Sequence, residues 1–388
     1  MRWKLVASGL ALIAATYGLA RFGYGLFLPR FAEAFDMGPG LSGAIQAGSF
    51  LSYCVTALLA ARLGSRPRLV IVLAGATAAL GAAGVAAAPN AEVLAAAVVL
   101  AGAGAGFATP GLVTLIESNV ESRRQENAQT IVNSGTGAGL VAAGSLLILV
   151  GSHWRLGWAA IAAVVILATG ATLRSDRKKK PAAASAPVPA PGRKELVLLG
   201  RPLVAAGLAG ASSAAAWTFG RTVLAEGTET ELYSIGAWMV LGAFGMLGAA
   251  AGSMVQNWSL RTAWTATTAL MSAATLLLAA APGFPAVAYG AAALFGASYI
   301  AMSGVLIVWA VRVLPEAGSA GTVALFIALA VGQAAGSLVL GALLQPQAPL
   351  PAFGLAAAVG VLAVLPAWIR GKAARDSRRE VSYGSLQR

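Results

Sequence analysis

Twelve long apolar stretches, separated by short polar connections, make up most of this chain. Each is roughly 20 residues long, the length that an α-helix needs to cross a hydrocarbon layer of about 30 Å. Only helices and closed barrels satisfy their backbone polar groups in lipid, and these stretches lack the alternation of barrel strands. The charged fraction is 11%, against about 25% in soluble domains. The sequence therefore predicts an all-α membrane protein.

The predicted transmembrane spans form two groups of six. The first group covers residues 5–31, 42–61, 69–88, 91–116, 128–151 and 156–173, and the second covers 203–224, 233–255, 263–281, 286–311, 320–343 and 352–369. Residues 174–201 contain a basic run and an Ala/Pro/Ser tract, which is too polar to span a membrane and too rich in proline to fold. We expect an N-terminal six-helix bundle (1–173), a cytoplasmic linker (174–201), a C-terminal six-helix bundle (202–370) and a basic tail (371–388).

Basic residues predict the orientation, because positively charged loops stay in the cytoplasm. With both termini inside, most of the 27 Lys and Arg residues lie in cytoplasmic loops and tails; Arg30 and Arg155 fall in the external loops. The net charge of +13 is spread over these loops and therefore does not indicate nucleic-acid binding. The basic tail is expected to lie against anionic lipid.

Two arginines, Arg21 and Arg221, lie inside apolar spans, each four residues after an aromatic residue, Tyr17 or Trp217. Charges at membrane depth are costly and are usually functional. A guanidinium binds carboxylate or phosphate through two parallel hydrogen bonds, so the pair predicts an anion site between the two halves. Two alternatives remain open. Arg221 is within snorkelling reach of the surface beside Glu226, and either arginine could bond backbone carbonyls and hold its bundle together.

A glycine pattern also recurs between the halves. Spans five and eleven carry glycines with the same gaps, offset by 197 residues: Gly135, Gly139 and Gly144, then Gly332, Gly336 and Gly341. Duplication of a six-helix unit explains this pattern together with the arginine pair. Close helix packing by small residues explains the glycines alone.

The chain resembles the major facilitator superfamily. After span two the family commonly shows Gly-x-x-x-Asp-Arg-x-Gly-Arg-Arg; Arg62 and Gly64 match, while Ala57 and Ala61 replace the Gly and the Asp. Gly135-x-x-x-Gly139-Leu140 resembles the family's antiporter motif with leucine in place of proline, which gives less support to a drug–proton antiporter. The resemblance implies two six-helix bundles, both termini inside, a functional monomer and, because the stretch 21–24 is similar to bacterial members, a bacterial cytoplasmic membrane.

Superfamily members that carry organic phosphates or carboxylates resemble this chain in having one arginine on helix one and one on helix seven. Carried over by position, Arg21 and Arg221 would face the central cavity at similar depth and bind the anion from both domains. Rocking of the two bundles about this shared site would then give alternating access.

Helical spacing selects further candidates around the arginines. Those proposed to line the substrate site are Tyr17, Tyr24, Trp217, Gln46, Tyr53 and Tyr299, and those proposed for gating or coupling are Glu117, Arg62, Asn133 and Gln333. Each of these residues also has a simpler interpretation as a packing contact. For Glu117, that interpretation is a contact with Arg123 or Arg124 at the cytoplasmic end of span four.

Three classes of function remain. The leading hypothesis is a secondary carrier of a small organic anion, driven by exchange, symport or a gradient of the anion itself; the second is an efflux carrier of amphiphilic compounds; the third is a non-transport membrane protein. No enzyme activity, cofactor or metal site is predicted, because the sequence shows no nucleophile–base pair and no Cys/His cluster. The glycines at 102, 104 and 106 lie within an apolar span and lack the context of a nucleotide-binding loop.

Overall fold

The computed structural model describes residues 2–176, 193–227, 230–248, 258–345 and 347–369. Across these residues the regular elements are helices, with no strand, which confirms the predicted all-α fold. Eleven of the described helices are long and apolar enough to cross a membrane, and Glu231–Leu247 is a shorter apolar helix. The predicted eighth span, 233–255, continues into residues 249–257, outside the described residues.

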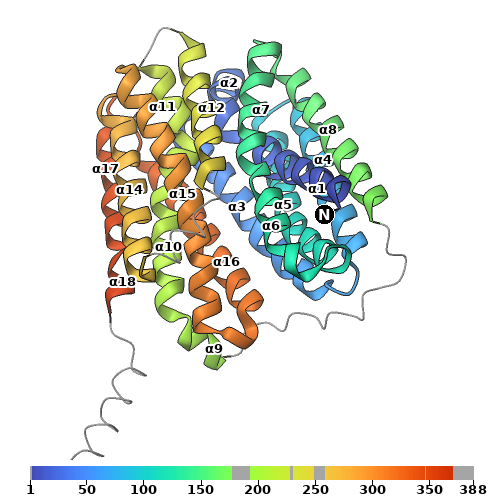
Figure 1. Ribbon diagram of the computed structural model, residues 1–388. Coiled ribbons are helices and arrows are strands. Elements are labelled where there is room, and N and C mark those ends of the chain that lie inside the picture. Colours follow the sequence, from blue (N-terminus) through green and yellow to red (C-terminus); the bar gives the residue numbers. More distant parts are fainter. Residues whose placement is uncertain (1, 177–192, 228–229, 249–257, 346, 370–388) are drawn as a thin grey trace, which may run out of the picture.

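The helices form two groups that lie side by side (Figure 1). The first group contains α1 (Trp3–Ile13), η1 (Ala14–Arg21), α2 (Gly23–Phe35), α3 (Pro39–Arg62), α4 (Pro67–Ala87), α5 (Ala91–Asn119), α6 (Ser122–Asn133), α7 (Gly135–Val150) and α8 (Trp154–Ser175). The second contains α9 (Arg193–Leu198), α10 (Gly200–Ala214), η2 (Ala215–Phe219), α11 (Gly220–Glu226), α12 (Glu231–Gly248), α14 (Leu260–Ala280), α15 (Pro285–Val313), η4 (Pro315–Ala317), α16 (Gly318–Leu343), α17 (Leu350–Leu362) and α18 (Leu365–Trp368). The short helix α9 lies within the predicted linker. The central part of that linker and the tail lie outside the described residues.

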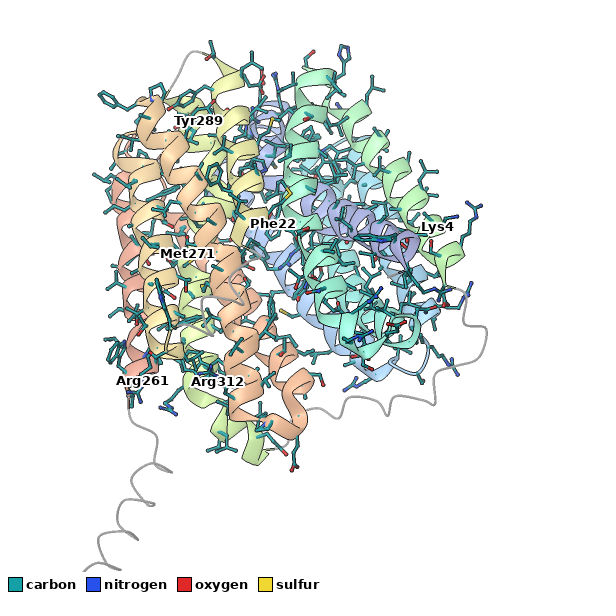
Figure 2. All side chains as sticks on the ribbon, viewed as in Figure 1. Lys4, Phe22, Arg261, Met271, Tyr289 and Arg312 are labelled. Carbon is teal, nitrogen blue, oxygen red and sulfur yellow. The ribbon has the colours of Figure 1, made fainter. Side chains whose placement is uncertain are left out.

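The two ends of the molecule are defined by the chain path. We call the end where α8 stops and α10 starts the linker end, and the opposite end, where α2 stops and α3 starts, the far end. Arg261 and Arg312, from two loops predicted to be cytoplasmic, both lie at the linker end, whereas Tyr289 lies toward the far end (Figure 2). The ribbons of the two bundles converge at the far end and diverge toward the linker end (Figure 1).

Several helices begin with residues suited to a helix start. Proline occupies the first turn of α3, α4 and α15, where its missing N–H costs no hydrogen bond. The side chains of Asn90 and Ser259 cap α5 and α14 by accepting from the backbone N–H groups of Val93 and Thr262. The ends of these spans are therefore set by local sequence.

The glycine repeat marks equivalent close contacts in the two bundles. In each half, two glycines of the fifth span face backbone carbonyls of the first span, and a Cβ atom there would overlap the carbonyl oxygen. The pairs are Gly135 with Leu10 and Gly139 with Ala14 in the first half, and Gly332 with Gly207 and Gly336 with Ala211 in the second. Both members of each pair recur 197 positions later. The glycines therefore serve close helix packing at equivalent positions of the two halves, which agrees with duplication of a six-helix unit.

The third glycine of each set faces the other bundle. Gly144 on α7 packs against Met239 on α12, and Gly341 on α16 packs against the backbone of Pro39 at the start of α3. The same two helix pairs, α7 with α12 and α3 with α16, form most of the contact between the bundles. The inter-bundle interface is thus built twice by equivalent helices, as expected for a pair of related six-helix units.

The first helix of each half contains a π-helical segment, η1 in the first and η2 in the second. π-Helical turns are rare and are frequent at functional sites. Arg21 is the last residue of η1, and Arg221 follows η2 by two residues. The unusual backbone therefore lies where the sequence places its two membrane-embedded charges.

Candidate functional site

Arg21 is buried, with 4% of its surface exposed, at the point where helix one changes from π to α geometry. The backbone N–H of Phe22 donates to the carbonyl oxygen of Tyr17 at 2.9 Å, a bond across five residues that completes the wider turn. The turn presents Tyr17, Arg21 and Phe22 together on the inner side of the first bundle. This local geometry brings two aromatic rings against the guanidinium.

Four aromatic rings surround the Arg21 guanidinium. Its Cζ atom lies 4.1 Å from the ring centroid of Tyr53, 5.1 Å from that of Phe50, 5.2 Å from that of Phe22 and 5.6 Å from that of Tyr17. Aromatic faces attract cations, more strongly when the cation is desolvated. We call these four rings the aromatic cage. The cage stabilises a buried cation without neutralising its charge.

The cage leaves Arg21 without a complete set of hydrogen bonds. Its Nε atom is buried and has no hydrogen-bond partner among the described residues. A buried donor without an acceptor costs roughly 1–3 kcal/mol, and more when it is charged. A ligand that supplies an acceptor at this point would satisfy the buried Nε of Arg21.

The second bundle approaches Arg21 from the other side. Phe22 stacks on Trp217 with ring centroids 4.2 Å apart, and Trp217 meets Tyr299 edge to face at 5.1 Å. The hydroxyl of Tyr299 accepts from Gln333 Nε2 at 3.1 Å. Arg21 therefore lies at the interface of the bundles, with aromatic and polar groups of both around it.

Arg221 has a different environment, because each of its three nitrogens has a partner. Its Nη1 donates to the carbonyl oxygen of Leu26 at 2.6 Å, its Nη2 to Glu231 at 2.5 Å and its Nε to the hydroxyl of Ser234 at 3.3 Å. Arg30 of the first bundle binds the second carboxylate oxygen of Glu231. We call Arg30, Glu231 and Arg221 the far-end latch, since they join the two bundles at that end.

The two arginines, predicted to lie at similar depth, do not occupy equivalent positions of the two halves. The glycine contacts relate the halves by 197 residues, whereas Arg21 and Arg221 are 200 residues apart. Arg221 therefore lies three positions farther along its helix, about 4.5 Å at helical rise. By the offset of 197, Thr218 corresponds to Arg21; its hydroxyl hydrogen-bonds that of Ser337 at 2.9 Å. The cavity lined by Arg221 has a volume of about 10 Å³, room for one water molecule at most.

The structure gathers some of the other predicted site residues around Arg21. Tyr17 and Tyr53 belong to the cage, and Trp217 and Tyr299 approach from the second bundle with Gln333 behind them. Tyr17 also hydrogen-bonds Thr109 at 2.9 Å. These side chains form one cluster that spans the interface.

Gln46 and Tyr24 differ from that cluster. Gln46 is 1% exposed and its Oε1 has no hydrogen-bond partner among the described residues. It lies one helical turn before Phe50 and therefore on the face of α3 that carries the cage. Tyr24 packs on Phe31 and donates to the backbone oxygen of Ser42 at 3.1 Å, a contact that joins α2 to α3. Tyr24 is thus a packing residue in this conformation.

The residues predicted for gating or coupling lie mainly on the surface. Glu117, Arg62 and Asn133 are exposed, whereas Gln333 is buried beside Tyr299. The expected contact of Glu117 with Arg123 or Arg124 is not formed, because both arginines approach Glu121 instead, at 4.0 and 3.8 Å.

Sequence reasoning missed four residues of these two clusters: Phe22, Phe50, Arg30 and Glu231. A signal for Phe50 existed, because it shares a helix face with Gln46 and Tyr53. Arg30 and Glu231 were placed in external loops, and no pattern along the chain indicates that they meet across the bundles.

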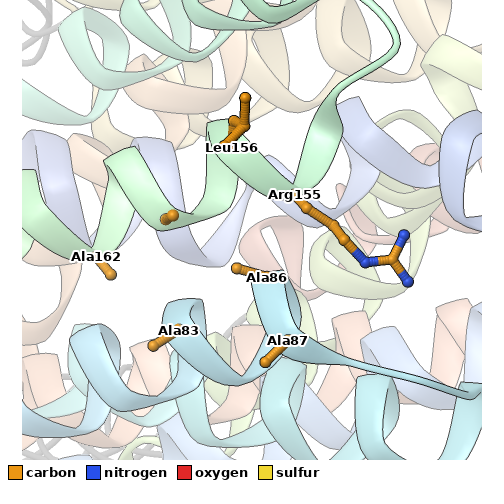
Figure 3. A pocket seen from close by; sticks show the side chains of 7 residues that line it. Ala83, Ala86, Ala87, Arg155, Leu156 and Ala162 are labelled. Atoms are coloured by element: carbon orange, nitrogen blue, oxygen red, sulfur yellow. The ribbon is translucent and has the colours of Figure 1, made fainter.

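A further hollow, between α4 and α8, is lined by Ala83, Ala86, Ala87, Ala159, Ala162, Leu156 and Arg155 (Figure 3). Its lining is apolar except for Arg155, and it lies on one bundle only.

Comparison with known proteins agrees with this architecture. The family model described as Major Facilitator Superfamily matches residues 10–336. The chain belongs to this superfamily. It is a multi-pass membrane protein with a transporter fold. No curated protein matches it significantly.

Three solved structures share the fold along nearly the whole chain. A nucleoside transporter, NupG, has a TM-score of 0.73 at 12% identity, covering 95% of this chain and 98% of its own. A bacterial homolog of the human lysosomal transporter Spinster, inward-facing and unoccupied, has 0.67 at 16%, covering 94% of each. A peptide transporter, POT, has 0.73 at 14%, covering 94% of this chain and 93% of its own. At these identities the likeness establishes the fold, and the substrate has to be argued from the site.

Proposed function

We propose that this protein is a secondary active transporter of a small organic anion, a carboxylate or phosphate, and that Arg21 binds the anion. The observation that carries the proposal is the state of Arg21: buried, uncompensated by any acidic group among the described residues, and with an unpartnered Nε. A guanidinium remains charged at any physiological pH. Its missing partner is therefore an acceptor, and an anionic one also neutralises the charge.

The aromatic cage supports binding as well as burial of the cation. The rings of Tyr53 and Phe50 lie close to the guanidinium carbon, so they shield it from water and restrict its movement. A desolvated, pre-positioned guanidinium forms stronger charge-assisted hydrogen bonds than an exposed one. Arg21 thus has no protein acceptor for its buried Nε, whereas each of the three nitrogens of Arg221 has one.

The position between the bundles supports coupling of binding to movement. Trp217 and Tyr299 of the second bundle pack near Arg21, so rocking of the bundles changes the surroundings of the bound anion. In the described conformation the far end, predicted to be external, is closed by the latch and by the contact of Gly25 with the backbone of Trp217. We accordingly propose alternating access in a bacterial cytoplasmic membrane, by a monomer with both termini inside.

Transport by reconstituted protein tests the proposal. Organic anions are first screened for thermal stabilisation of the purified protein, since a ligand stabilises the native state by mass action. The best anion is then followed as labelled uptake into proteoliposomes. We expect Arg21→Lys and Arg21→Ala each to abolish uptake, because lysine lacks the paired donors of the guanidinium.

Arg155→Lys and Arg155→Ala are the matched controls. Arg155 also lies on an aromatic ring, 4.2 Å from the centroid of Trp154, but it is exposed and far from the interface. These variants should retain uptake. Wild-type uptake by folded Arg21 variants contradicts the proposal. Arg21-independent changes in the cellular accumulation of amphiphilic cations would favour the efflux alternative instead.

A further inference from the structure

The number of positive charges available at the site restricts the charge of the substrate. Away from the ends of its spans, the chain carries two charged side chains, Arg21 and Arg221. A substrate bound at membrane depth has to be neutralised there, because an unpaired charge in a low-dielectric interior is strongly unfavourable. The number of these arginines that remain free therefore decides which anions can be carried.

The far-end latch removes Arg221 from this count. Glu231 contacts both Arg221 and Arg30, and Glu33 lies 3.7 Å from Arg30. With Glu33 included, two glutamates face two arginines at the far end. The three nitrogens of Arg221 also have partners within the protein. An anion could use Arg221 only after the latch had been broken and Glu231 left with a single arginine.

Among the described residues at membrane depth between the bundles, Arg21 is then the charge that has no acidic partner. The polar side chains that the structure gathers around it are neutral: Tyr17 and Tyr53 of the cage, and Tyr299 with Gln333 from the second bundle. One anionic group neutralises this site completely. A second anionic group on the same molecule would be left in a neutral, largely aromatic environment.

We propose that the substrate is a monoanion, a monocarboxylate with an apolar or aromatic body, and that dicarboxylates and phosphate monoesters are excluded by charge. This inference rests on the proposed function and narrows it. The guanidinium carbon lies over the rings of Phe50 and Tyr53, and the Nε atom has no hydrogen-bond partner among the described residues, so the N–H edge that includes Nε lacks a protein acceptor. A planar carboxylate meets such an edge with two parallel hydrogen bonds. The surrounding rings suit an apolar body in the same way that they suit the arginine stem.

Ligands matched in shape and different in charge test this inference on the full-length purified protein. The aromatic series is benzoate, terephthalate, phenyl phosphate and neutral benzamide, and the aliphatic pair is butyrate and succinate. At pH 7.5 phenyl phosphate carries mostly two charges, since the second pKa of such esters is about 6. We expect benzoate or butyrate to bind at least about tenfold more tightly than its doubly charged partner, measured by calorimetry or thermal shift, and benzamide not to bind measurably.

Variants separate this inference from the function on which it rests. Arg21→Lys should abolish binding of the monocarboxylate. Gln333→Lys places a second cation behind Tyr299 and should shift the preference toward terephthalate or succinate. If this variant does not fold, the comparison of monoanions with dianions on the wild-type protein still tests the single-charge inference. Dianions that bind as tightly as monoanions, in an Arg21-dependent manner, would overturn the single-charge inference and leave the anion carrier standing. Binding of benzamide that is unaffected by Arg21→Lys, or no binding by either series, counts against both.

Discussion

Removing the negative charge of Glu231 should open the far end of the protein. Glu231 lies between Arg221 of its own bundle and Arg30 of the other. Glu231→Gln keeps the size of the side chain and removes the attraction to both arginines. Arg221 keeps its bonds to Leu26 and Ser234, but the two arginines now repel each other across the interface. The conformation closed at the far end is therefore destabilised relative to the one open there.

The size of the effect follows from the burial of the partners. Breaking a fully buried ion pair costs roughly 3–5 kcal/mol. The Arg221 side chain is 0% exposed, but that of Glu231 is 37% exposed, so solvent screening reduces the effect to about 2 kcal/mol. That corresponds to about a 30-fold change in the equilibrium between conformations. A far-end-open population of about one molecule in 100 would rise to about one in four.

Distances between spin labels at the far end measure this population. Cys54 is the only cysteine of the chain, so labels can be placed at His153→Cys and Phe284→Cys in a Cys54→Ala background. Both positions are exposed, and they lie on different bundles. Glu231→Gln should add a longer distance to the distribution.

Glu33→Gln is the matched control. It also removes an acid that faces Arg30, but from within the same bundle. This variant should leave the distance distribution of the wild type unchanged. The reasoning fails if Glu231→Gln leaves the distances unchanged, or if both substitutions lengthen them equally.

Three further changes have outcomes set by particular contacts. Gly25→Ala places a methyl group onto a carbonyl oxygen of the second bundle and should open the far end in the same spin-label assay, whereas Gly23→Ala, with its nearest atoms at 3.8 Å, should not. Gly336→Ala overlaps the facing backbone within the second bundle and should lower stability by about 1–3 kcal/mol, seen as a lower melting temperature, whereas Gly354→Ala has nothing within 4 Å and should leave it unchanged. Tyr53→Leu removes the nearest ring of the cage and should weaken anion binding by roughly 0.5–2 kcal/mol, measured by calorimetry; unchanged affinity would show that the ring does not stabilise the bound state.

The fold was predictable because it depends on features that repeat along the chain. Span length, loop charge and helix-breaking residues each carry local information, and they gave the all-α architecture and the two groups of helices. The glycine offset of 197 added a relation between the halves that the backbone contacts of Gly135 and Gly332 bear out. The α9 helix was missed because a tract rich in proline and basic residues gives no helical signal over six residues.

The site was predictable only in part, because it depends on contacts between distant segments. Arg21 and Tyr53 were selected by cost of burial and helix face, and the structure brings them together. The partners of Arg221 were not selected, because Glu231 was read as a residue of an external loop. The carboxylate of Glu231, at the start of α12, meets Arg30 only after both bundles have packed. The sequence alone does not show that these two residues are close in space.

The two arginines show how a shared sequence pattern can end in different chemistry. Each follows an aromatic residue by four positions, which suggested equivalent roles, and each lies at the end of or just after a π-helical segment. A register difference of three residues, about 4.5 Å, carries Arg221 to where Leu26 and Glu231 can accept from it, and leaves Arg21 among rings that cannot accept in the same way. In the second half, the protein supplies the acceptors for Arg221. In the first half, under the proposed function, the substrate supplies the acceptor for Arg21. Glu231→Gln and Arg21→Lys should therefore have opposite consequences: the first changes the balance of conformations and keeps anion binding, and the second removes binding and keeps the far end closed.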